Sequence, residues 1–244
     1  MSGFFMHRFF ADFPLQESLS LRKEQPLFHQ IGHVFRAKIW HEVIFFEDNG
    51  PDCVYKIIDV SAKNISFQRI EIWKNLWGRG WPHICLFQAY PHKMSALELI
   101  VQKIVEMGVH ELVLFPGEYS QVQLLPASKM QRLLAIAREA MEQSGGNALL
   151  RISEKNNIAE CFPIHSEMYH IIAHPGAQQA LALPEKIENS LGLWVGPEGW
   201  WSPKEQDIFH DKSLPFWSFS NRILRLETAS ILWVGILGYL CRSK

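Results

Sequence analysis

The sequence predicts an α/β protein in which a parallel sheet flanked by helices follows a small β-rich unit. Three observations support this class. After residue 82, short apolar runs alternate with stripes of helical period, which is the pattern of a parallel sheet with crossover helices. Between residues 31 and 72, short alternating runs are separated by turn residues, which favours antiparallel strands. A hydrophobic content of 48% with 20% charged residues is typical of a folded globular chain.

The N-terminal unit is expected to hold three strands, at residues 42–47, 53–60 and 65–72, with a turn at 48–51. Residues 75–82 carry glycines and a proline among tryptophans, and the periodicity changes there. We therefore expect one domain over residues 1–75 and a second over 76–244.

The second domain opens with a strand at 84–89, a helix at 95–107 and a strand at 111–115. Ser95 and Glu98 have the spacing of a capping box, and Gly108 follows the helix as its C-terminal signal. The pattern predicts a strand, a crossover helix and a second, parallel strand.

Further helices are expected at residues 127–144 and 225–240, with buried strands at 169–173, 191–195 and 214–219. Ser202, Pro203 and Glu205 together predict another helix start. The apolar run from Ala229 to Cys241 is shorter than the roughly 20 residues of a membrane span. It therefore predicts a buried terminal helix.

Charge and cysteine content exclude some classes of protein. A formal charge of -1 does not indicate a polyanionic partner, so any nucleic-acid contact requires a local basic patch. The four cysteines lie far apart without a CxxC pair, which indicates neither a metal site nor a disulfide framework. With no secretory signal at the N-terminus, we expect a cytoplasmic protein.

Three loops follow predicted strands, at residues 174–176, 196–199 and 220–222. Ligands of open parallel sheets bind beyond the carboxyl ends of the strands, so these loops are the candidate site. Simpler interpretations remain open. The loop Gly196-Pro197-Glu198-Gly199 could be a tight turn with an exposed glutamate, and Arg225 and Glu227 could form a solvated ion pair.

Two of these segments, Leu193 to Gly199 and Arg222 to Ala229, resemble the signature pair of the bacterial small-subunit (16S) rRNA uridine N3-methyltransferases, a SPOUT family. Residues 98–108 are similar to the family's first helix, and residues 142–144 to the end of its second helix. Near the N-terminus, His7 to Phe10, with His29, Val34 and Arg36, resembles the family's PUA-like RNA-binding β-barrel domain. The resemblance is nearly end to end.

The resemblance implies a trefoil knot, a homodimer and S-adenosyl-L-methionine held in a bent form by the three loops. It implies no metal. The residues expected to bind the cofactor are Ala173, His174, Val195, Gly196, Pro197, Glu198, Gly199, Phe219, Ser220, Arg222, Ile223, Leu224 and Thr228. Arg225 is expected to stabilise negative charge, and Glu198 or Glu227 to position groups or accept a proton. Arg8, Arg36, Lys38 and Lys93 are expected to contact RNA.

The sequence also departs from the family pattern. Phe219-Ser220 replaces a Leu-Gly pair, Trp200 a glycine, Gly146 an arginine and Ala96 a lysine. These changes motivate an alternative hypothesis, a knotted RNA-binding or ribosome-assembly protein with impaired catalysis. An α/β-hydrolase is disfavoured because no G-x-S-x-G elbow is present.

Overall fold

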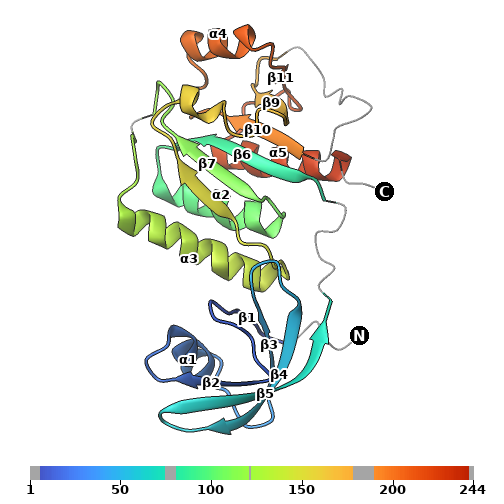
Figure 1. Cartoon of the computed structure of the whole chain (residues 1–244). Helices are drawn as coiled ribbons and strands as arrows, with labels where there is room; N and C mark the ends of the chain where they lie inside the picture. Colours follow the sequence, from blue (N-terminus) through green and yellow to red (C-terminus); the bar gives the residue numbers. More distant parts are fainter. Residues whose placement is uncertain (1–5, 75–80, 121, 178–189, 242–244) are drawn as a thin grey trace. The chain divides into compact units, whose positions relative to one another are not determined.

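The computed structural model describes residues 6–74, 81–120, 122–177 and 190–241. The chain divides into two compact units (Figure 1). The first comprises Met1–Trp77 and Met141–Leu149, and the second comprises Gly78–Ala140 and Leu150–Lys244. The boundary expected at residues 75–76 lies outside the described residues.

The first unit is built on a five-stranded sheet of order β1-β3-β4-β5-β2. The strands are β1 (Arg8–Phe10), β2 (Ser18–Arg22), β3 (Glu42–Phe46), β4 (Asp52–Val60) and β5 (Asn64–Trp73). Only β1 pairs in parallel, with β3; the other described pairs are antiparallel. The three strands expected from the sequence are confirmed. The short helix α1 (Pro26–His29) and the π-helix η2 (Gln30–Val34), as well as β1 and β2, were not predicted.

The core of this unit is rich in aromatic residues. Phe45 packs edge-on against Tyr55 and Phe67, with ring centroids 5.4 and 5.2 Å away. Phe9 and Phe28 join them in the same buried cluster. The cluster also takes alternate residues of β4 and β5, which point to the same face of the sheet.

Residues 141–149, expected in the second domain, belong to the first unit. The Glu142 carboxylate accepts hydrogen bonds from the backbone N–H of Phe10 (2.9 Å) and from Gln30 Nε2 (3.2 Å). Asn147 Nδ2 donates to the Gly50 carbonyl at 2.8 Å. These long-range polar contacts leave no periodic signal in the sequence, so patterning could not have revealed them.

The second unit contains a six-stranded parallel sheet of order β11-β9-β10-β6-β7-β8. The strands are β6 (His83–Ala89), β7 (Glu111–Phe115), β8 (Arg151–Glu154), β9 (Tyr169–Ala173), β10 (Ser190–Val195) and β11 (Phe216–Trp217). The predicted parallel sheet flanked by helices is confirmed. Strand β8 was missed, and β11 is shorter than the expected 214–219.

Helices lie on both faces of this sheet; they are α2 (Met94–Glu106), α3 (Ala127–Ser144), α4 (Pro203–Asp211) and α5 (Leu226–Cys241). On one face Phe209 of α4 packs with Phe87 and Trp194, together with the short 3-10 helix η3 (Ile158–Cys161). On the other face, Ser230 of α5 hydrogen-bonds to Gln88 at 2.6 Å. Helix α2 packs against α5.

The two predicted helix starts had different outcomes. At α4, Ser202 Oγ accepts from the Glu205 N–H (3.1 Å), and the Glu205 carboxylate accepts from the Ser202 N–H (2.8 Å). The capping box expected at Ser95 is wrong, because α2 begins at Met94 without a side-chain cap. Glu98 instead forms an ion pair with Arg132 of α3 at 2.7 Å.

The trefoil knot remains an expectation about how the last strands and helix thread, and residues 178–189, between β9 and β10, lie outside the described residues. The fold class does not depend on that segment. Within the described ranges, no helix is long and apolar enough to cross a membrane.

Candidate functional site

A cavity of about 330 Å³ lies at the carboxyl ends of β9, β10 and β11. Its walls come from the loops that follow these strands and from the first turns of α5. Strands β11, β9 and β10 are neighbours in the sheet, so three loops far apart in the sequence meet at one edge. This is the place where open parallel sheets bind ligands.

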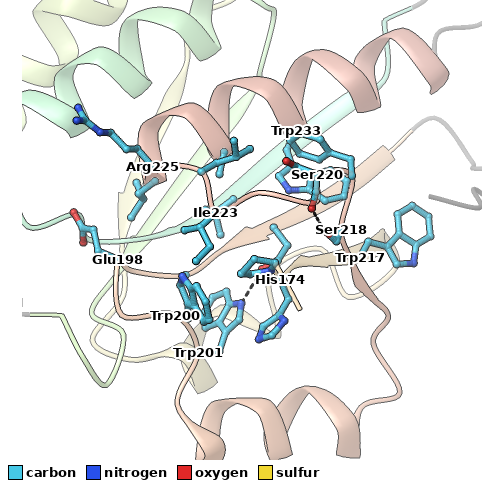
Figure 2. Close-up of a pocket in the computed structure, with 18 of the residues that line it drawn as sticks. His174, Glu198, Trp200, Trp201, Trp217, Ser218, Ser220, Ile223, Arg225 and Trp233 are labelled. Carbon is cyan, nitrogen blue, oxygen red and sulfur yellow. Dashed lines mark hydrogen bonds between the residues drawn. The ribbon is translucent and has the colours of Figure 1, made fainter. Parts of the chain in front are cut away.

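Aromatic side chains form much of the cavity wall (Figure 2). Sequence reasoning did not select Trp201, Trp217 or Trp233. Trp201 is fixed from both sides, because its Nε1 donates to the Ala173 carbonyl at 3.2 Å and its ring stacks on Phe115 at 6.3 Å. Trp201 and Trp217 lie close to strand ends in the sequence, which was the one available signal, whereas Trp233 lies inside α5.

This packing leaves little room for a side chain at Gly196. A Cβ atom built on it would lie 3.1 Å from the Trp201 indole ring. This close approach explains a glycine directly after β10, and it lets the backbone form part of the cavity wall.

The substitutions at residues 219 and 220 leave the cavity open. The Phe219 ring turns against Trp233, edge to face with centroids 4.7 Å apart. The Ser220 hydroxyl accepts a hydrogen bond from the Arg222 N–H at 3.1 Å, and so it organises its own loop. Both residues line the cavity without filling it.

His174 contributes a neutral imidazole to the wall. Burial lowers the pKa of its side chain below the ordinary value of 6.5. Its Nδ1 accepts from the Gly176 N–H at 3.1 Å, which requires an unprotonated nitrogen at that position. The ring lies edge-on to Trp200 at 6.1 Å.

Glu198 and Arg225 are the charged groups of the site, together with Arg222. Glu198 Oε1 accepts a hydrogen bond from the His92 N–H at 2.9 Å. Figure 2 shows Glu198 and Arg225 on the same side of the pocket. Arg225 immediately precedes α5, where a cation interacts unfavourably with the helix dipole. Helix stability therefore does not explain an arginine at this position.

The cavity gathers most of the expected cofactor residues but not all of them. Those that line it are Ala173, His174, Val195, Gly196, Pro197, Glu198, Phe219, Ser220, Arg222, Ile223 and Leu224. Gly199, Glu227 and Thr228 are not among the lining residues. Glu227 lies in the first turn of α5, where a carboxylate stabilises the helix.

Of the expected RNA-binding residues, Arg8 is the one whose side chain is paired within the first unit. Its Nη2 lies 2.7 Å from Asp52 Oδ1, with both side chains only 10% exposed. Its Nη1 donates to the Gly146 carbonyl at 3.1 Å, and the guanidinium stacks over Phe46. Arg8 therefore holds the first unit together, whereas Arg36, Lys38 and Lys93 are exposed.

The described residues contain no group of three or more His, Cys, Asp or Glu side chains placed to hold a metal ion.

The second unit also matches a known family. The model of the RNA methyltransferase domain matches residues 79–238. The chain belongs to the RNA methyltransferase domain family. The match spans β6 to α5 and so includes the whole cavity.

Relatives of this RNA methyltransferase chain extend beyond the matched domain. A Bacillus subtilis protein named ribosomal RNA small subunit methyltransferase E is 26% identical over 255 aligned residues, covering 96% of each chain. Ribosomal RNA small subunit methyltransferase E 2 of Borreliella burgdorferi is 31% identical over 144 residues. That alignment covers 57% of this chain and 59% of the relative. The resemblance inferred from the motifs is confirmed.

Solved structures share the fold along nearly the whole chain. A Legionella pneumophila protein solved in complex with the cofactor SAM has a TM-score of 0.86 at 23% identity, covering 96% of this chain and 98% of that one. A ribosomal RNA small subunit methyltransferase E from Neisseria gonorrhoeae, bound to S-adenosyl methionine, has a TM-score of 0.83 at 20% identity and the same coverage. At these identities the likeness establishes the fold alone.

Proposed function

We propose that this protein uses S-adenosyl-L-methionine to methylate N3 of a uridine in 16S rRNA of the small ribosomal subunit. The observation that supports this most strongly is the cavity at the ends of β9, β10 and β11, with Arg225 and Glu198 at one side. It lies within the part of the chain that matches the RNA methyltransferase domain.

The cavity fits the cofactor in chemistry. Its wall combines tryptophan faces for an adenine ring with loop backbone at Gly196 and Leu224, and with neutral His174. Pockets for such ligands are mostly apolar with a few placed polar groups. The cofactor, when bound, supplies an electrophilic methyl group on a sulfonium. Gly199 and Thr228 also belong to the proposed set, although they do not line the cavity.

The protein's own contribution is alignment and charge stabilisation. Uridine N3 carries a weakly acidic proton that must leave before or during methyl transfer. We assign to Arg225 the stabilisation of the negative charge that develops on the base or a nearby phosphate. Glu198 or Glu227 positions groups or accepts the proton. Between the two, only Glu198 lines the cavity.

Outside the cavity, the proposal assigns RNA binding to the N-terminal unit, as a PUA-like domain over residues 1–75. Arg36 and Lys38 of this unit, together with Lys93 of the second unit, would contact phosphates, which orient RNA without reading its sequence. We further propose a homodimer in the cytoplasm. Helix α5 is largely apolar, and it exposes three large hydrophobic side chains, those of Leu232, Tyr239 and Leu240. A second subunit would cover such residues.

Cofactor binding together with measurable methylation of rRNA separates this proposal from the alternative of a catalytically impaired RNA-binding protein. We expect isothermal titration calorimetry to detect binding of S-adenosyl-L-methionine to the full chain. Ile223→Ala, which removes an aliphatic wall residue, should weaken binding about fivefold. Leu134→Ala removes a similar exposed side chain from α3 and should have no effect. Absence of binding to the unaltered protein would support the alternative.

A further inference from the structure

Trp40 occupies an unusual position in the first unit. It lies in the segment between η2 and β3, and its side chain is 67% exposed. Its backbone φ is +77°, in the left-handed region that bulky residues rarely adopt. Because the indole buries little apolar surface and the backbone conformation favours glycine, the stability of the fold does not explain a tryptophan here.

The backbone contacts hold Trp40 in a defined position. Its N–H donates to the Ile57 carbonyl of β4 at 2.8 Å, and the Ile57 N–H donates to the His41 carbonyl at 2.9 Å. Lys56 places its Nζ 4.5 Å from the centroid of the indole ring. The ring is therefore presented from a segment that is hydrogen-bonded to the sheet.

The surrounding segment has the charge of a polyanion-binding surface. Residues 29–41 contain no aspartate or glutamate but include Arg36, Lys38 and three histidines. Arg36, Lys38 and His41 are exposed. Glu42, the cross-strand partner of Lys56, is the first acidic residue after this segment.

An exposed indole with cations around it is suited to one class of ligand. Unpaired nucleobases stack on aromatic side chains, and the phosphates between them pair with lysine and arginine. A base-paired duplex hides its base faces within the helix, so it offers the indole no ring to stack on. These properties favour single-stranded nucleic acid.

We propose that Trp40 is a stacking platform for an unpaired base of the RNA substrate, with Arg36 and Lys38 contacting the flanking phosphates and Lys56 lying against the indole. This rests on the proposed function, because it assumes that RNA is the substrate. It adds a specific base-binding site to a unit otherwise expected to contact phosphates alone.

The test uses the full chain and a fluorescein-labelled single-stranded oligouridylate of about 12 nucleotides, a length within the usual site size. Binding is followed by fluorescence anisotropy at fixed salt. Trp40→Gly suits the left-handed backbone and removes the whole side chain, and it should weaken binding about tenfold or more. Trp40→Phe keeps an aromatic face and should stay within about threefold of the unaltered protein.

Ile72→Ala is the matched control, since Ile72 is also an exposed apolar residue of the same unit; its affinity should equal that of the unaltered protein. A duplex of the same length should bind Trp40→Gly and the unaltered protein equally. Equal affinity of Trp40→Gly and the unaltered protein for the single strand would overturn the proposal. So would an equal loss for Ile72→Ala. Calorimetry with S-adenosyl-L-methionine tests the proposed function separately, so the two failures are distinguishable.

Discussion

The carboxylate of Glu198 accepts a hydrogen bond from the backbone N–H of His92 at 2.9 Å. This contact joins the loop after β10 to the loop after β6, across 106 residues of sequence. A side chain that accepts a backbone hydrogen bond is held in place, and it holds the loop in turn. Glu198 therefore has the geometry of a group that orders the wall of the cavity.

Two substitutions at Glu198 separate positioning from proton transfer. Glu198→Gln keeps an oxygen that can accept from His92, so we expect methyl transfer to stay within about tenfold of the unaltered protein. Glu198→Ala loses the acceptor and should weaken cofactor binding by about tenfold, because a hydrogen bond to a charged group contributes about 1.5 to 3 kcal/mol. Calorimetry and steady-state kinetics measure the two effects. A collapse of kcat in Glu198→Gln, with cofactor affinity unchanged, would instead identify Glu198 as the proton acceptor.

Arg225 should matter for catalysis and not for stability. Arg225→Ala removes the proposed charge-stabilising group, so kcat should fall by about 100-fold or more. The melting temperature should stay the same or rise slightly, because a cation at a helix N-terminus is unfavourable by about 0.3 to 1 kcal/mol. Thermal unfolding and a methylation assay on the same preparation test both parts. A lower melting temperature together with lower activity would indicate a structural role.

Gly238 of α5 lies against Trp81 so closely that a Cβ atom would overlap the indole ring. Gly238→Ala should therefore destabilise the protein by about 1 to 3 kcal/mol. Gly235→Ala is the matched control on the same helix, because its Cβ would meet only the flexible Met107 side chain at 3.4 Å. There the gain in helix propensity, about 1 kcal/mol, should dominate. Chemical denaturation compares the two, and equal effects would contradict the packing argument.

The two arginines Arg8 and Arg36 should behave in opposite ways. In the unaltered protein the side chains of Arg8 and Asp52 are each only 10% exposed. Arg8→Ala removes this partner of the Asp52 carboxylate and should therefore lower the free energy of unfolding by about 2 to 4 kcal/mol. Arg36→Ala should leave stability unchanged and weaken oligonucleotide binding, with a salt dependence reduced by about one charge. Denaturation and anisotropy titrations at several salt concentrations distinguish them. An unchanged stability for Arg8→Ala would contradict the structural role.

Because the side chain of His110 is buried, we expect the folded protein to lose stability in acid. Burial, and after it the neighbouring His83, lower the pKa of His110 from 6.5 to about 4. Its Nδ1 is buried without a hydrogen-bond partner among the described residues. Between pH 6.5 and about 4 the unfolded state binds this proton and the folded state does not, so stability falls as the pH falls through that window.

The pKa of His165, whose ring lies near that of His83, shifts in the opposite direction. Its carboxylate partners Glu111 and Glu167 raise the pKa of this histidine despite its burial. His110→Gln should therefore flatten the fall in melting temperature between pH 6.5 and 4, whereas His165→Gln should remove a loss of stability that accompanies rising pH above about 6.5. Unchanged slopes in both variants would contradict these assignments.

The parts of the fold that follow a regular period could be predicted. Strands β4, β6, β9 and β10 and helices α2, α3 and α5 lie within a few residues of the expected bounds. Non-periodic features could not. Glu98 has the spacing of a capping box but forms an ion pair with Arg132 on another helix. Arg8 lies in a segment that resembles the family's RNA-binding domain, but its side chain forms an ion pair with Asp52.

The candidate site shows the same division. Glycine- and proline-rich loops after buried strands gave its position, because parallel strands bring their carboxyl ends to one edge. The contribution of Trp201 and Trp233 to the cavity wall depends on the directions of their side chains. The spacing of residues in the sequence does not predict these directions. Phe219 turned out to pack sideways against Trp233, which only coordinates could reveal.

The proposed reaction forms N3-methyluridine in small-subunit rRNA. The most direct measurement incubates the purified full chain with S-adenosyl-L-methionine and with small ribosomal subunits or 16S rRNA that lack the modification, followed by nucleoside mass spectrometry. We expect the unaltered protein to form N3-methyluridine and Arg225→Ala to lower the rate of methylation about 100-fold. A protein that binds the cofactor and the RNA but produces no N3-methyluridine on either substrate would contradict it.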